Sequence, residues 1–259
     1  MSERVRVARD GSIEVVTLDY PSRLNVLDRA GWEALATAVR GAAEDAEVRC
    51  ILIRGAGRKA FSAGSDISVF PAQRFEGEDV RSYGAVIESA LTAISDCPVP
   101  TVAMIEGACV GGGVEIAACC DLRICSASSR FGAPINRLGL TMSHAELRPL
   151  VRAVGSNATL EILLEGAIFG AARAQEMGLV NRVVPDAELE VEAMNAARRV
   201  AAGAPLVNRW HKKFVRRLAD PTPLSEEEIA EGYAAFDTED YRTGVRAFLE
   251  KEDPEFEGR

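Results

Sequence analysis

Histidine and paired cysteines are scarce in this sequence. It has only two histidines among 259 residues, and none of its six cysteines belongs to a CxxC pair. Structural zinc sites and disulfide frameworks both need such closely spaced ligands. We therefore expect no metal site and no disulfide scaffold. Buried, reduced thiols are the simpler interpretation, and they favour a cytoplasmic protein.

Long apolar runs are missing as well. The first twelve residues contain no apolar h-region, so we expect no secretory signal. The longest weakly polar stretch is residues 105–121 (IEGACVGGGVEIAACCD), and Glu115 interrupts it. A membrane helix needs about 20 predominantly apolar residues. The sequence therefore predicts no contact with a membrane.

Positive charge is in deficit. The chain has 30 Lys and Arg against 39 Asp and Glu, which gives a net charge of -9. No basic block is interleaved with aromatic residues, so we expect no nucleic-acid partner. One basic cluster stands out, residues 209–217 (RWHKKFVRR). Its spacing is typical of a solvated helix face, with an anionic ligand or a neighbouring subunit as the alternatives.

Strand and helix signals alternate through most of the chain. Residues around Asp10-Gly11 alternate between apolar and polar, which predicts a hairpin. Asp28 is a suitable N-cap for the amphipathic segment that follows it. Further strands are predicted at 50–54, 101–107, 122–127 and 179–184, and helices at 79–96, 144–153, 157–165 and 171–177. After residue 186 only helices are predicted, at 187–203, 206–219, 225–236 and 239–251. We expect an α/β core, residues 1–197, and an all-helical C-terminal region, residues 198–259.

Two local patterns resemble common motifs without their context. Gly55 and Gly57 fit the loose dinucleotide pattern GxGxxA, but the chain continues into a second turn and not into a helix. Ser62 lies in AFSAG, which lacks the first glycine of the GxSxG nucleophile motif. His144 or His211 could serve it as a base, but a turn residue is the better interpretation of Ser62.

Two glycine-rich turns follow successive strands. They are residues 61–66 (FSAGSD) and 107–113 (GACVGGG), and Glu115 lies two residues beyond the second. Glycine allows close approach to a ligand, and two convergent backbone N–H groups form an oxyanion hole. A first-turn carboxylate such as Glu115 can also simply stabilise its helix dipole, by about 0.3–1 kcal/mol. Its apolar neighbours indicate burial, which raises a carboxyl pKa towards that of a general acid or base.

These motifs resemble the crotonase, or enoyl-CoA hydratase/isomerase, superfamily. The resemblance rests on FSAGSD and GGGVE, on CDLRICSASSRFGAP at 120–134, and on PSRLNVL at 21–27. It implies a spiral of ββα units with a helical C-terminal trimerisation region. It also implies acyl-CoA substrates, a homotrimer or dimer of trimers, and no cofactor beyond the coenzyme A that the substrate carries.

The resemblance assigns roles to individual residues. The N–H groups of Ser65 and Gly112 would bind the thioester oxygen, and Glu115 would act as the acid or base. Ser65 replaces the more usual alanine, which leaves a backbone donor unaffected. Arg23 would contact the phosphates or ribose, with surface solvation as the alternative. The remaining substrate-binding candidates are Ala63, Gly64, Asp66, Gly111, and, from a neighbouring subunit, Phe248 and Lys251.

One position departs from the family pattern. Hydratases of the family carry a second glutamate directly after the proline of FGxP, where this chain has Ile135. His144 is a candidate substitute because histidine is the side chain suited to proton transfer near neutral pH, and a plain helix-start residue is the alternative. Glu146 fits a capping box with Ser143, so we interpret it as structural.

The sequence therefore predicts an enzyme that stabilises a thioester enolate, most simply an enoyl-CoA hydratase or dehydratase. An isomerase, a decarboxylase or a thioester hydrolase of the same family remains open. So does an acyl-CoA-binding scaffold without catalysis, which Ile135 favours and Glu115 disfavours.

Overall fold

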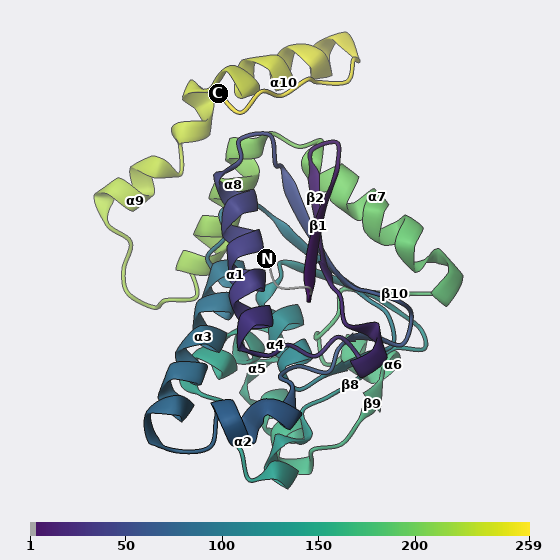
Figure 1. Ribbon diagram of the computed structural model, residues 1–259. Coiled ribbons are helices and arrows are strands. Elements are labelled where there is room, and N and C mark those ends of the chain that lie inside the picture. The colour runs from purple at the N-terminus through teal and green to yellow at the C-terminus, as the bar shows by residue number, and fades with distance from the viewer. Residues whose placement is uncertain (1–3) are drawn as a thin grey trace.

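A six-stranded sheet forms the centre of the molecule in the computed structural model, which describes residues 4–259 (Figure 1). Its strand order is β1-β2-β3-β5-β7-β10. The first two strands form the predicted antiparallel hairpin, and Gly11 turns with φ 59°. The other neighbours pair in parallel. The strands are β1 (Val5–Asp10), β2 (Ile13–Leu18), β3 (Cys50–Gly55), β5 (Thr101–Ile105), β7 (Leu122–Ser126) and β10 (Arg182–Val184).

The structure also contains a second, four-stranded sheet, which the sequence did not distinguish from turns. Its order is β4-β6-β8-β9, with β4 (Ala60–Ser62), β6 (Ala108–Val110), β8 (Arg130–Gly132) and β9 (Phe169–Gly170). Each of β4, β6 and β8 follows a strand of the large sheet and precedes a helix. This repetition is the spiral of ββα units that the resemblance implied.

Helices cover both faces of the large sheet. In Figure 1, α1 (Arg29–Glu44) and α3 (Gly77–Ser95) lie on one side and α7 (Leu189–Ala201) on the other. Successive strand residues alternate between the faces, so Ile51 and Ile53 join the core of α1 and α3, whereas Leu52 packs with α7. Asp28 caps α1 as predicted, because its carboxylate accepts the Gly31 N–H at 2.8 Å. All six cysteines are buried and unpaired. No helix within residues 4–259 combines the length and apolarity needed to cross a bilayer.

The helices of the second half surround and extend this core. They are α2 (Phe70–Gln73), α4 (Gly112–Cys119), α5 (His144–Glu165), α6 (Ala171–Glu176), α8 (Pro205–Arg217), α9 (Glu226–Glu231) and α10 (Glu239–Glu250). The predicted boundary at residue 197 falls inside α7, because the buried face of that helix continues to Ala201. The chain leaves the sheet only after that residue.

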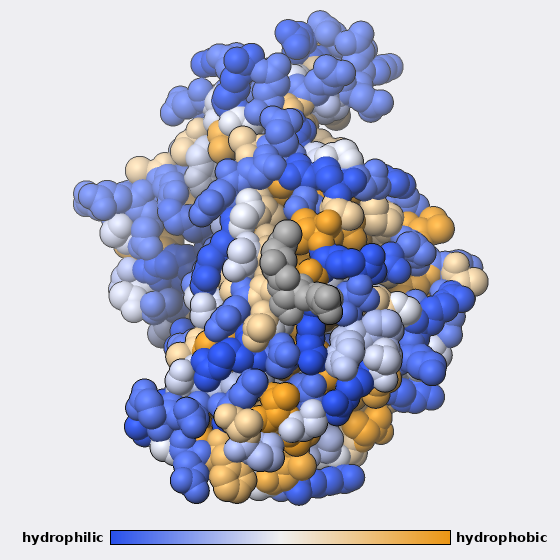
Figure 2. Space-filling model, viewed as in Figure 1, coloured by the Kyte–Doolittle hydropathy of each residue, from blue (hydrophilic) through white to orange (hydrophobic). Residues whose placement is uncertain are grey.

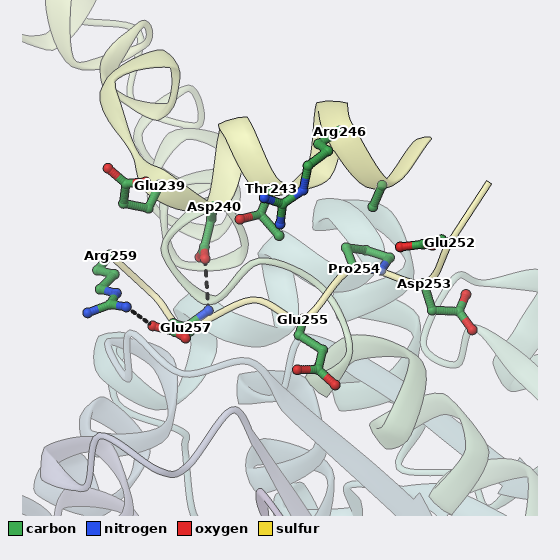
Figure 3. Close-up of a pocket in the computed structure, with 11 residues that line it drawn as sticks. Glu239, Asp240, Thr243, Arg246, Glu252, Asp253, Pro254, Glu255, Glu257 and Arg259 are labelled. Carbon is green, nitrogen blue, oxygen red and sulfur yellow. Dashed lines mark hydrogen bonds and ion pairs between the residues drawn. The ribbon is translucent and has the colours of Figure 1, made fainter. Parts of the chain in front are cut away.

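The last residues fold back along α10, at the end of the molecule opposite α2 (Figure 1). The buried Asp240 carboxylate accepts the N–H groups of Glu257 and Gly258 at 2.8 and 3.0 Å. Figure 3 shows the hollow between the two segments, about 700 Å³ and lined mostly by charged side chains. Its lining contains none of the predicted site residues.

The basic helix α8 is held to the core by an ion-pair group around Asp121. Lys212 Nζ lies 2.6 Å from Asp121 Oδ2, and Arg216 donates to Asp121 Oδ1 at 2.8 Å. Lys212 also donates to the Val99 carbonyl, and its side chain is only 7% exposed. Burial lowers the Lys212 pKa, which the Asp121 charge opposes. The basic face of α8, which was expected to be solvated, is therefore partly buried against the core.

Asp121→Asn is expected to lower the free energy of unfolding by about 2–3 kcal/mol. Removing one partner of a fully buried pair costs about 3–5 kcal/mol, and the partial exposure of Asp121 and Arg216 reduces this cost. Urea denaturation followed by circular dichroism measures the change. Glu239→Gln is the matched control, because it breaks an exposed pair with Arg242 that contributes at most about 1 kcal/mol. Equal losses in both variants would contradict the internal role of Asp121.

Candidate active site

At one cavity, two backbone N–H groups take no part in the backbone hydrogen bonds of the fold. Leu27 forms a parallel bridge with Ser65: its N–H donates to Gly64 O, and Asp66 N–H donates to Leu27 O, both at 2.8 Å. In a parallel bridge this pattern directs the N–H of Ser65 to the other side. Gly112 begins α4, and the first N–H groups of a helix have no intrahelical acceptor. Within residues 4–259 neither N–H has a backbone acceptor, and both residues line one cavity.

The glycines are needed because these two segments touch. A Cβ on Gly64, at φ +81°, would lie 2.4 Å from Gly112 N, and one on Gly113 would lie 2.1 Å from Ser62 O. Both distances are shorter than any real Cβ contact. The sequence predicted glycines for close approach to a ligand. The structure shows that they first allow close approach of one backbone to the other.

Ser62 is a structural residue of the first turn. It is completely buried, its hydroxyl donates to Asn25 O at 2.9 Å, and it accepts the N–H of Gly64 at 3.0 Å. Both bonds hold the turn that presents Ser65. Ser62 is the last residue of β4 and not itself a turn residue, but it stabilises the turn that follows and is no exposed nucleophile.

The Ser65 side chain anchors its loop to α1. The indole N–H of Trp32 donates to Ser65 Oγ at 3.1 Å, and Trp32 is fully buried. The ring of Trp32 also lies beside Gly112, where an added Cβ would be 3.0 Å away. A single indole therefore lies against both donor residues.

The cavity at these donors is small. It measures about 70 Å³, well below the roughly 300–1,000 Å³ of pockets that hold drug-sized ligands. Figure 2 shows hydrophobic surface at the end of the molecule where Figure 1 places α2. Apolar side chains form much of the lining, and the charged ones are a glutamate pair and an arginine. The lining residues used below are Ala63, Ser65, Phe70, Arg74, Gly111, Gly112, Glu115, Ile135, Leu138, Met142 and Glu146.

Glu115 is the buried acid of this cavity. Its side chain lies in the first turn of α4, and the residue is 5% exposed. Burial and, second, the charge of Glu146 raise its pKa to about 8, and the smaller effect of the Arg74 charge opposes them. Glu115 therefore holds a proton at neutral pH, as the predicted general acid or base should.

Glu146 is the residue whose place in the site the sequence missed. The predicted capping box is present, because Ser143 N–H donates to Glu146 Oε2 at 2.5 Å and Glu146 N–H donates to Ser143 Oγ. The same side chain is buried and lines the cavity with Glu115. Its Oε1 accepts no hydrogen bond from the residues described here. The capping pattern explained Glu146 fully as a structural residue, so the sequence offered no reason to place its side chain in the cavity as well.

His144 does not lie in the cavity, where the sequence made it a candidate to replace the second glutamate. It is the first residue of α5, it is exposed, and it is absent from the cavity lining. Residues two apart on a helix point about 200° apart, so Glu146 faces the cavity and His144 faces solvent. Ile135 does line the cavity and occupies it with an apolar side chain.

A family model described as enoyl-CoA hydratase/isomerase matches residues 8–259. The chain belongs to the enoyl-CoA hydratase/isomerase family. The short-chain-enoyl-CoA hydratase of Clostridium acetobutylicum is 32% identical over 95% of both chains. The methylmalonyl-CoA decarboxylase of Escherichia coli is 32% identical over 98% of both. The crystal structure of an enoyl-CoA hydratase/carnithine racemase from Magnetospirillum magneticum has a TM-score of 0.98 and 44% identity, covering 100% of this chain and 97% of that one.

As a member of this family the chain is an enzyme with the crotonase fold. Relatives with different reactions share that fold, so the side chains of the cavity must define the reaction.

The residues expected to hold coenzyme A lie in two places. Arg23 is half-exposed and does not line the cavity; it contacts Ser68 at 3.1 Å and Asp66 at 3.5 Å. Asp66 is buried, and although burial opposes its ionisation, Ser68 and the charges of Arg23 and Arg4 hold its pKa below the ordinary value. Its side chain thus supports the loop. Phe248 lies on α10 and Lys251 directly follows that helix, and neither lines this chain's own cavity.

Ser65→Ala is expected to lower the free energy of unfolding by about 1–3 kcal/mol, because the buried indole N–H of Trp32 loses its acceptor. Its kcat should fall by less than the about 10²–10³-fold that loss of an oxyanion donor costs, since the backbone N–H remains. Thermal denaturation and steady-state kinetics on the same preparation test both parts. A collapse of kcat without a stability loss would mean that the hydroxyl itself takes part in the reaction.

The raised pKa of Glu115 also predicts a pH-dependent stability. Between pH 4.5 and about 8 the folded chain holds a proton that the unfolded chain releases, so this contribution is full below pH 4.5 and lost by pH 8. The stability of wild type relative to Glu115→Gln should therefore decline as pH rises, by up to about 1.4 kcal/mol per pH unit. Urea titrations at several values between pH 5 and 9 measure it. Parallel curves for the two proteins would exclude the raised pKa.

Proposed function

We propose that this chain hydrates short 2-enoyl-CoA thioesters and catalyses the reverse dehydration. The observation that carries the proposal is a pair of buried carboxyl groups, Glu115 and Glu146, on two helices that face one cavity with the N–H groups of Ser65 and Gly112. Hydration needs both elements: donors for the thioester oxygen and two groups that move the protons of water.

The thioester oxygen would lie between Ser65 N–H and Gly112 N–H. Attack of water on the β-carbon moves electrons to this oxygen, and the enolate that forms is negatively charged. Fixed backbone donors stabilise such charge without reorganising. The N-terminal end of α4 adds a favourable dipole at Gly112.

The different surroundings of the two carboxyl groups suggest their roles. Glu115, protonated up to a pKa of about 8, would donate a proton to the α-carbon. The free Oε1 of Glu146 would accept the proton of the attacking water, while Oε2 stays bound to Ser143 N–H. Glu146 thus supplies the carboxylate that Ile135 does not. In dehydration the two roles are exchanged.

The proposal extends to the binding of coenzyme A and to the assembly of subunits. The small cavity suits a short acyl chain, which leaves coenzyme A outside it near Arg23. Large apolar side chains on the C-terminal helices are exposed in the single chain, including Val215, Phe248 and Leu249. Such surface favours a subunit interface and supports the proposed homotrimer or dimer of trimers, in which Phe248 and Lys251 would complete a neighbour's site. The six buried thiols favour the cytoplasm, and no cofactor is required beyond the substrate's coenzyme A.

Decarboxylation is the second candidate. It uses the same enolate and needs no second carboxylate, and the apolar Ile135 together with the 32% identical decarboxylase relative favours it. Loss of carbon dioxide with no gain of water distinguishes this reaction from hydration by mass.

Glu115→Gln is expected to lower kcat for hydration of crotonyl-CoA by about 10²–10⁴-fold, because it removes the proton donor. Glu146→Gln should produce a loss of similar size. It should also move the alkaline limb of the pH profile, near pH 8 in wild type, to lower pH, because the charge that raises the Glu115 pKa is gone. Absorbance of the enoyl thioester follows both variants across pH 6–9.

His144→Ala is the matched control for Glu146→Gln, since it changes the same helical turn on the solvent side. It should retain the wild-type pH profile. A loss in His144→Ala that equals the loss in Glu146→Gln would overturn the assignment of the second carboxyl group.

A further inference from the structure

Arg74 is a cation in the wall of the acyl cavity. It follows the last residue of α2, is half-buried, and lines the cavity together with Glu115 and Glu146. Its guanidinium carbon lies 5.3 Å from the centre of the Phe70 ring and 5.5 Å from that of Tyr83. The two rings hold the side chain by cation–π contact and leave the edge of its guanidinium fork available.

The guanidinium has no anionic partner among residues 4–259. None of their carboxylates lies within 4.0 Å of it, and it donates no side-chain hydrogen bond to them. Nearby arginines differ: Arg29, which also lies over Tyr83, donates to Ser82, and Arg81 pairs with Glu78. An arginine has five N–H donors in a planar fork that matches a carboxylate in bidentate geometry.

The two glutamates of the cavity do not satisfy this arginine. Glu115 holds a proton up to about pH 8, so it carries little charge at neutrality. Glu146 has one oxygen bound to Ser143 N–H and forms no ion pair with Arg74. The site therefore retains a cation whose donors are free for a ligand.

We propose that Arg74 binds a carboxylate carried by the acyl chain, so that the preferred substrates are short 2-enoyl thioesters ending in a carboxylate. This inference rests on the proposed function for the reaction, and adds the substrate class. With the thioester oxygen at Ser65 and Gly112, and coenzyme A outside the small cavity, a group that reaches Arg74 belongs to the acyl chain.

The test compares three thioesters that differ only at the chain end. They are crotonyl-CoA, its analogue with a carboxylate on the fourth carbon (4-carboxybut-2-enoyl-CoA), and the same analogue as the terminal amide. The amide has nearly the shape of the carboxylate without its charge. Wild type should prefer the carboxylate over the amide by about 30-fold or more in kcat/KM, the size expected for a partly buried charge-assisted pair.

Variants of Arg74 separate recognition from a general electrostatic effect. Arg74→Met keeps a chain that packs on Phe70 and Tyr83, and should reduce the carboxylate-to-amide ratio to about one, while Arg74→Lys should restore part of it. Arg81→Met, at an exposed arginine on α3, should keep the wild-type ratio and rate. If Arg74→Met lowers kcat/KM equally for all three thioesters, Arg74 acts on Glu115 and the inference is overturned.

A binding measurement keeps this inference separate from the reaction. Isothermal titration calorimetry compares the saturated 4-carboxybutanoyl-CoA with its terminal amide in wild type and Arg74→Met, and neither ligand can be hydrated. A carboxylate preference that Arg74→Met removes supports the inference even if no enoyl thioester gains water, in which case only the hydratase proposal fails. Equal affinity of wild type for both ligands overturns the inference even if crotonyl-CoA is hydrated.

Discussion

The contact between the backbones of Gly64 and Gly112 is the constraint on which the site depends. Parallel pairing of β4 with β6 brings the two turns together, and the missing side chains let them touch. The same contact sets the separation of the two free N–H groups and positions the first turn of α4, from which Glu115 extends. Any side chain at Gly64 or Gly113 would meet backbone atoms, which cannot move aside as a flexible side chain can. One backbone contact therefore positions both the two N–H donors and the carboxyl group of Glu115.

The charged groups of the cavity differ in their hydrogen-bond partners and, for Arg74, in burial, and these differences organise the chemistry of the cavity. Glu115 lies among apolar residues of α4 and retains its proton, whereas Glu146 keeps a backbone donor at one oxygen. Arg74 is only half-buried and rests on aromatic rings. Three ionisable groups thus share a small space without forming ion pairs with one another. Pairing would neutralise them, so their separation preserves a proton, a proton acceptor and a cation in one cavity.

The sequence predicted the long elements well because their periodicity is strong. The hairpin around Gly11, the cap at Asp28 and the helical C-terminal region all have local signals that tertiary contacts do not override. The strands of the small sheet are two or three residues long, too short for any period to register. The basic face of α8 shows a different limit. Its pairing with Asp121 joins residues about 95 positions apart, which no local pattern encodes.

Within the site, backbone motifs were easier to predict than side-chain partners. The glycine turns identify where Ser65 and Gly112 must lie, since only glycine tolerates such close backbones. Arg74 gave no signal, because a single arginine after a short helix resembles any surface residue. Glu146 gave a misleading signal, since its capping role was correct and complete in itself.

Glu146 both closes the capping box of α5 and lines the cavity, so the start of this helix and the charge of the cavity depend on one residue. Serine, aspartate and asparagine are similarly favoured at a helix N-cap, so a cap residue alone can change with little cost. Here, exchanging the residue that closes the capping box also changes the charge beside Glu115. Neutral drift at this turn is therefore restricted. A substitution of Glu146 therefore removes a helix-capping contact and a cavity charge together.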